Sequence, residues 1–242
     1  MKKLYEKNEL TFALVWIGIY CALQSLANPL NERLGIAYSV SALFCMLQAA
    51  VLFRFLKKNK LLTRYGLCKS SVPARRFLYY MPLVVLVTRN FWSGAAVNLP
   101  AAGTVCYLVC MLFVGFVEEL IFRGFLFEAI ARDNVKTAVI VSSVTFGLGH
   151  LINLINGSGA GLAENLFQVT GAIAIGFLFV VLYYRGGSLL PCVITHALIN
   201  MTSVFANEAG LTLEKRIIFQ IILFAITAGY AFVLTRTLPK KG

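Results

Sequence analysis

The chain has 242 residues, of which 59% are hydrophobic and 13% are charged, and its mean hydropathy is +0.80. This composition excludes an ordinary soluble globular domain and indicates a polytopic membrane protein. The net charge of +12 would suit nucleic acid, but the Lys and Arg residues cluster in short segments between apolar runs. That pattern is typical of cytoplasmic loops, so we expect a lipid bilayer around the chain and no nucleic-acid partner.

Apolar runs in the first part of the chain predict three membrane spans. The first, Leu10 to Ala27, is longer than the core of a signal peptide, and we interpret it as an uncleaved helix. The second, about Ile36 to Phe55, leads into eight Lys and Arg residues between positions 54 and 76. The positive-inside rule places this connection, and therefore the N-terminus, in the cytoplasm. The third span covers about Phe77 to Trp92.

Five further spans follow, and they complete a predicted single all-α transmembrane domain over residues 1–242. An even count of about eight spans places the C-terminus in the cytoplasm together with the N-terminus. A glycine-rich connection, Asn156 to Leu162, follows the fifth span, and Pro191 falls in the first turn of the seventh, where proline is tolerated. The five spans cover about Gly103 to Ala131, Thr137 to Leu154, Phe167 to Tyr184, Ser188 to Phe205 and Ile217 to Leu234.

Two adjacent carboxylates, Glu118 and Glu119, lie inside the predicted fourth span behind seventeen uncharged residues. An ionisable group at membrane depth is costly and usually serves function. Arg123 follows Glu119 at the i, i+4 spacing that favours an ion pair. Adjacent helical residues point about 100° apart, so we expect the two glutamates not to face one site equally. We infer that Arg123 holds Glu119 and leaves Glu118 free to take a proton from water.

Both histidines of the chain, His150 and His196, fall within predicted spans. Helix rise places Glu118 and His150 at about the same height, roughly 22–24 Å from the turn that joins their helices. His196 and Asn200, at i, i+4, project from one helix face and could donate hydrogen bonds to a developing oxyanion. Phe146 precedes His150 by one turn and suits packing, and the glycines at positions 147 and 149 favour close helix approach.

Three motifs formed by these residues resemble those of the CPBP family of intramembrane endopeptidases. They are Glu118-Glu119-x-x-x-Arg123, Phe146-x-x-x-His150 and His196-x-x-x-Asn200, in that order within a catalytic core at about 103–205. The family contains CAAX prenyl-protein endopeptidases and bacterial bacteriocin-processing or immunity (Abi) proteins. Gly124, directly after Arg123, is similar to the bacterial branch.

The resemblance implies hydrolysis of a peptide bond in a membrane-associated or lipidated peptide, in a bacterial plasma membrane. Glu118 and His150 would activate water, while His196 and Asn200 would support the oxyanion, with Glu119, Arg123 and Phe146 in supporting positions. We favour this glutamic-type mechanism without a cofactor. The alternative is a metalloprotease in which Glu118, His150 and His196 bind zinc.

Two other classes of function stay open at this point. A bacteriocin-immunity or scaffold protein could keep the fold without catalysis, because motifs do not guarantee turnover. Intramembrane Glu, His and Arg residues also build proton-coupled carriers, although the chain lacks the paired broken helices that many transporters have.

Overall fold

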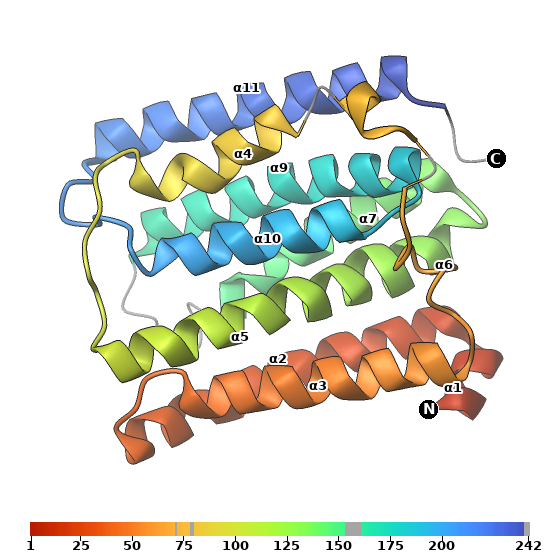
Figure 1. The fold of residues 1–242 in the computed structure, drawn as a ribbon, viewed down its shortest axis with the longest axis horizontal. Coiled ribbons are helices and arrows are strands. Elements are labelled where there is room, and N and C mark those ends of the chain that lie inside the picture. The colour runs from red at the N-terminus through yellow and green to blue at the C-terminus, as the bar shows by residue number, and fades with distance from the viewer. Residues whose placement is uncertain (71, 78–79, 153–160, 240–242) are drawn as a thin grey trace.

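The computed structural model describes residues 1–70, 72–77, 80–152 and 161–239, which form an all-helical bundle (Figure 1). Extended structure among these residues consists of one antiparallel bridge, between Ala95 and Ala206. The first part of the chain forms α1 (Lys2–Lys7), α2 (Glu9–Leu34), α3 (Ser39–Lys58), the 3-10 helix η1 (Ala74–Phe77), α4 (Met81–Thr88) and the 3-10 helix η2 (Arg89–Phe91). The second part forms α5 (Ala101–Glu119), the π-helix η3 (Leu120–Phe127), α6 (Glu128–Ala131), α7 (Val135–Gly149), α9 (Leu162–Gly186), α10 (Leu190–Ser203) and α11 (Leu213–Thr237).

The helices are arranged so that those carrying the three motifs occupy the middle of the bundle. Helices α2 and α3 form one edge, α4 and α11 form the opposite edge, and α5, α7, α9 and α10 lie between them (Figure 1). The main packing partners are α7 with α9, α5 with both α10 and α3, and α9 with α11. The motif residues are therefore enclosed by other helices.

In the described part of the chain, five helices are long and apolar enough to cross a membrane, which supports an integral membrane protein. They are Glu9–Leu34, Ser39–Lys58, Ala101–Ala131, Leu162–Gly186 and Leu213–Thr237. The predicted third, fifth and seventh spans correspond to α4 with 8 residues, α7 with 15 and α10 with 14. These three helices are about 12–23 Å long, shorter than a hydrocarbon core of about 30 Å. The expected count of eight spans is therefore not confirmed.

Side-chain exposure agrees with a lipid environment for the outer helices. Only 22% of the apolar window of α2 and of α11 is buried inside the protein, against 56% for α9. In a bilayer these outward-facing apolar side chains contact lipid tails, which are as apolar as leucine. Helix α1 and the end of α11 lie at the same end of the bundle (Figure 1). The cytoplasmic placement of the termini remains a prediction.

Helix α2 runs past the predicted end of the first span. We expected that span to end at Ala27, but the helix continues through Pro29 to Leu34 and stops at Gly35, whose φ of 68° suits glycine. The extension is stabilised by buried Asn31, whose amide donates to the Ser41 hydroxyl at 2.9 Å and accepts from the Val40 N–H at 2.8 Å.

Two further predicted features concern the ends of the fifth and seventh spans. The predicted end of the fifth span at Leu154 and most of the connection Asn156 to Leu162 lie outside the described residues. Helix α10 begins at Leu190 with Pro191 in its first turn, as predicted.

Glu9 joins two basic segments at one end of the bundle. Its carboxylate lies 2.7 Å from Arg64 Nη2 and 2.6 Å from Arg132 Nη2. Arg64 belongs to the basic connection after α3, and Arg132 to the turn after α6. The two connections that we predicted to be cytoplasmic therefore share one end of the molecule.

The two glycines before His150 differ in their surroundings, although we expected both to allow close helix approach. A Cβ at Gly147 would lie 2.9 Å from the Val169 carbonyl oxygen and 3.0 Å from the Ile173 backbone nitrogen on α9. A Cβ at Gly149 would meet no atom of the described residues within 4 Å. The prediction is confirmed for Gly147 and wrong for Gly149.

We expect Gly147→Ala to destabilise the protein by about 1–3 kcal/mol, because the added methyl group must push α7 away from α9. Gly149→Ala is the matched control, since the same methyl group enters open space. The free energy of unfolding of each variant would be measured in mixed micelles. Equal stability of the two variants would show that Gly147 is not a close-contact position.

Candidate active site

The glutamate pair lies where an α-helix becomes a π-helix. Glu118 and Glu119 are the last residues of α5, and the next eight residues form η3, in which every side chain is buried. We expected an unbroken α-helix from Gly103 to Ala131, so this is a correction. The wider π turn changes the direction of the side chains that follow, and such segments occur frequently at functional sites.

Arg123, within this π-helix, pairs with Glu119 as the spacing predicted. Its Nη1 atom lies 3.0 Å from Glu119 Oε1, and both side chains are fully buried. Its guanidinium also lies over the ring of Phe146, 4.0 Å from the ring centroid, and 5.7 Å from that of Phe179. Aromatic faces thus partly compensate a cation whose Nε and Nη2 atoms have no hydrogen-bond partner within the described part of the chain.

His196, on α10, lies between the two glutamates. Its Nδ1 atom is 2.7 Å from Glu119 Oε1, and its Nε2 atom is 3.5 Å from Glu118 Oε2. We expected that the two carboxylates would not face one site equally. Both nevertheless contact one ring, because the nitrogens of an imidazole lie on different edges and can meet two carboxylates that diverge from one helix.

A close crossing of α5 and α10 makes these contacts possible. A Cβ at Gly115 would lie 2.7–2.9 Å from the backbone N, the Cα and the Cβ of Ala197. Only glycine permits this approach, and it lies one turn before Glu118. His196 precedes Ala197, so the crossing brings the imidazole directly against the end of α5. In the sequence, the signal for this crossing is Gly115, a glycine inside an apolar run.

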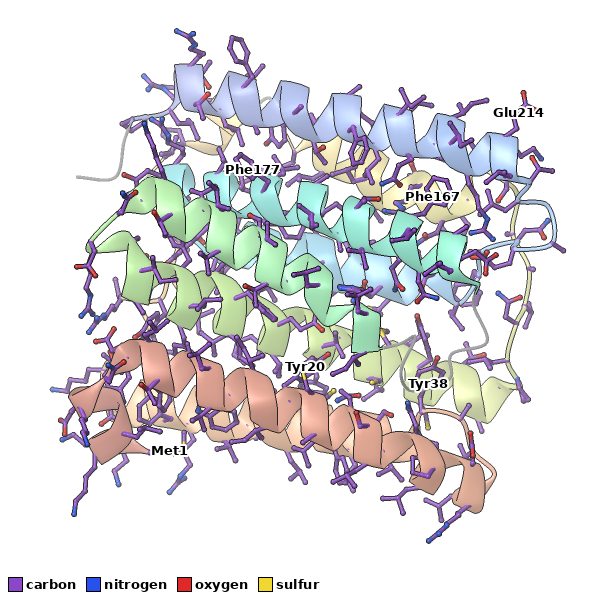
Figure 2. All side chains as sticks on the ribbon, turned by 180° about the vertical axis from the view of Figure 1, so that it is seen from behind. Met1, Tyr20, Tyr38, Phe167, Phe177 and Glu214 are labelled. Atoms are coloured by element: carbon purple, nitrogen blue, oxygen red, sulfur yellow. The ribbon has the colours of Figure 1, made fainter. Side chains whose placement is uncertain are left out.

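Glu118 has a partner that the motif residues do not supply. The Tyr20 hydroxyl, on α2, donates to Glu118 Oε1 at 2.5 Å. Tyr20 lies midway along α2 on the side that faces α5 (Figure 2). The expectation that Glu118 is free is therefore wrong, because a residue far away in the sequence closes the site from the N-terminal half.

His150 caps the end of α7 beside the other motif residues. Its Nδ1 atom lies 3.2 Å from the Phe146 carbonyl oxygen. Because a carbonyl only accepts hydrogen bonds, Nδ1 is the donor and Nε2 is left as an acceptor. The ring of Phe146 packs edge-on against both histidines, with its centroid 5.3 Å from that of His150 and 5.5 Å from that of His196.

Asn200 lies one turn after His196 on α10 and is half-buried. Its backbone carbonyl accepts from the Ser203 hydroxyl at 2.7 Å. Its side-chain amide makes no hydrogen bond with any residue that the structure describes, which leaves this amide able to bind a ligand.

Exposure divides the cluster into an inner and an outer set. The side chains of Glu119 and Arg123 are 0% exposed, whereas that of Glu118 is 12% exposed. His150 and Asn200 are also half-buried. The outer set can therefore meet water or a substrate, while the inner pair can act only through other residues.

Comparison with known proteins addresses the part of the chain that holds these motifs. Residues 100–202 match the family model described as type II CAAX prenyl endopeptidase, Rce1-like. This segment is similar to the CPBP family, and we call residues 100–202 the CPBP segment. No curated protein and no solved structure matches the chain. The CPBP segment includes α5, η3, α7 and α10, which carry all three motifs, and it excludes α2 and Tyr20.

The positions of Glu118, His150 and His196 do not support the alternative in which these residues bind zinc. Within the ranges that the structure describes, no group of three His, Cys, Asp or Glu side chains could hold a metal ion. Glu118, His150 and His196 are all described. His196 directs both ring nitrogens at carboxylates. The predicted ligand set is therefore not assembled.

Proposed function

We propose that the chain is an intramembrane endopeptidase that hydrolyses a peptide bond with water activated by Glu118 and His150. The family match supports a CAAX-type intramembrane protease. The observation that carries the proposal is the position of His196 between Glu118 and Glu119. This position places the proposed base, Glu118, next to a histidine that Glu119 orients.

Charge balance supports this reading of the cluster. When His196 carries both ring protons, the charges of Glu118, Glu119, Arg123 and His196 sum to zero. Burial strongly favours such a balance, since an uncompensated charge in an apolar interior is costly. Glu119 then holds the imidazolium at Nδ1 in the way that the carboxylate of a Ser-His-Asp triad holds its histidine.

The proposed reaction starts with a water molecule between Glu118 and His150. Glu118 takes one proton of the water, His150 Nε2 accepts a hydrogen bond from the other, and the water oxygen attacks the carbonyl carbon of the peptide. The contact of His196 Nε2 with Glu118 is 3.5 Å long, longer than a hydrogen bond. The Nε2–H group is thus able to donate to the oxyanion.

The second half of the reaction returns the proton. The Asn200 amide supplies the other hydrogen bond to the oxyanion, one helical turn from His196. Glu118 then gives its proton to the amide nitrogen, the C–N bond breaks, and a carboxylic acid and an amine are released. The net reaction consumes one water molecule.

The substrate that fits this site is a peptide held at the membrane. The site lies in the middle of an apolar bundle, and the name of the matched family refers to prenylated CAAX peptides. We propose a membrane-associated or lipidated peptide, cut near its C-terminus, in a bacterial plasma membrane. A non-catalytic immunity or scaffold role and a proton-coupled carrier are the competing functions.

Cleavage by purified protein in phospholipid vesicles tests the proposal. A prenylated C-terminal peptide, its unprenylated counterpart and a library of membrane-associated peptides would be incubated with wild type, His150→Ala and Asn200→Ala, and the products identified by mass spectrometry. We expect wild type to cleave and each variant to lose at least about 100-fold in rate. Proton flux across the vesicles without cleavage would favour the carrier, and neither cleavage nor flux would favour the scaffold.

A further inference from the structure

Tyr20 contacts the cluster from α2, outside the CPBP segment. Its hydroxyl donates to Glu118 Oε1 at 2.5 Å, a short bond of the kind that a hydroxyl forms with a carboxylate. The other oxygen, Oε2, faces His196. Each carboxylate oxygen thus faces a residue of a different helix, α2 at Oε1 and α10 at Oε2. These two contacts orient the plane of the carboxylate.

The bond to Tyr20 leaves room for the reaction. An ionised carboxylate offers about four lone-pair sites, and Tyr20 occupies one of them, so a water molecule can still bind. The hydroxyl donates more strongly to the ionised carboxylate than to its protonated form, which favours the ionised form. A base that takes a proton from water must start in that form.

We propose that Tyr20 is a positioning residue that orients Glu118 and keeps it ionised, so that α2 belongs to the catalytic unit. The hydrogen bond itself is the basis for the effect of Tyr20 on Glu118. The effect of Tyr20 on peptide cleavage rests on the proposed function. The hydrogen bond to Glu118 is the contact by which Tyr20 reaches the motif residues. Its role is therefore exerted through Glu118.

Other titratable groups surround this bond and have to be held constant in any test. Cys45 on α3 and Cys110 on α5 act on the Tyr20 hydroxyl, and Cys21 lies within electrostatic range of Glu118. His196 lies 3.5 Å from Glu118, His150 lies within electrostatic range of it, and Glu119 with its partner Arg123 follows it in the chain. A substitution that changes only the phenol hydroxyl leaves all of these groups in place.

Tyr20→Phe makes this change, because it keeps the ring and removes the hydroxyl. Tyr38→Phe is the matched control, since Tyr38 loses the same hydroxyl but packs on Tyr107, with ring centroids 4.6 Å apart, and not on Glu118. The state of Glu118 would be read by dicyclohexylcarbodiimide, which modifies protonated carboxyl groups in apolar surroundings. The labelled residue would be identified by fragment mass spectrometry over a pH series, with Glu118→Gln as the blank.

We expect the pH of half-maximal labelling of Glu118 to rise by about one unit in Tyr20→Phe, and to stay unchanged in Tyr38→Phe. The acid limb of the cleavage rate should move in the same direction, a result that a merely structural role of the ring would not produce. Equal labelling curves for Tyr20→Phe and wild type would overturn the proposal. A shift in labelling without cleavage by any form supports Tyr20 and counts against the protease, so the two failures are distinguishable.

Discussion

Glu118→Gln is expected to slow peptide cleavage by about 10²–10⁴-fold, the range that a positioned acid–base group contributes. The amide has the size of the carboxylate, and its oxygen can still accept the hydrogen bond from the Tyr20 hydroxyl, but it cannot take a proton from water. The loss should therefore appear in kcat and leave KM nearly unchanged. The measurement is the rate of product formation in vesicles, with the thermal unfolding midpoint recorded for the same sample.

The matched control is Glu214→Gln, an exposed glutamate in the first turn of α11. Glu214 lies at the opposite end of the bundle from Met1 (Figure 2). We expect this variant to cleave at the wild-type rate. If Glu118→Gln is folded and cleaves as fast as Glu214→Gln, Glu118 is not the base.

Arg123→Met should be the most destabilising single change, at about 3–5 kcal/mol. The substitution keeps an apolar stem against Phe146 but removes the buried guanidinium that pairs with Glu119. Because Glu119 is 0% exposed, water cannot replace the lost partner. The free energy of unfolding would be measured in mixed micelles of a denaturing detergent.

Two further variants separate the lost ion pair from the lost volume. Arg123→Met combined with Glu119→Gln removes both charges, and we expect it to recover at least half of the lost stability. Arg236→Met, at an exposed position on α11, should change stability by less than about 0.5 kcal/mol. An unfolding curve of Arg123→Met that coincides with wild type would show that the pair contributes nothing.

The parts of the site that depend on neighbouring residues could be predicted from the sequence. The spacing of Glu119 and Arg123 predicted their ion pair, and helix periodicity placed His196 and Asn200 on one face. Apolar runs also located every helix that carries a motif residue. In each of these cases the controlling interaction is local, so a single segment of sequence contains the information.

The parts that depend on contacts between distant segments could not be predicted in this way. The sequence around Glu118 does not indicate that Tyr20 is its partner. Tyr20 approaches from α2 because α2 packs on η3. The π-helix also escaped prediction, because Leu120 to Phe127 is apolar throughout and its pattern fits a buried α-helix equally well. Once the Gly115 crossing is in place, His196 lies 2.7 Å from Glu119 and 3.5 Å from Glu118. These unequal distances agree with the expectation that the pair does not face one site equally.

The lengths of the spans show the same limit. Hydropathy located α4, α7 and α10, but it gave each of them the length of a full membrane crossing. The real helices end earlier, and α7 ends at Gly149, directly before His150. The apolar run there continues past the helix end, which hydropathy alone cannot detect.

Single-turnover cleavage in H₂¹⁸O tests most directly whether Glu118 activates water. If Glu118 is a base, the new C-terminal carboxylate of the product carries one ¹⁸O atom in the first turnover, and Glu118 itself carries none. Both would be read by mass spectrometry of the product and of the peptide that contains Glu118. Incorporation of ¹⁸O into Glu118 would instead indicate direct attack by its carboxylate on the peptide and would contradict the mechanism.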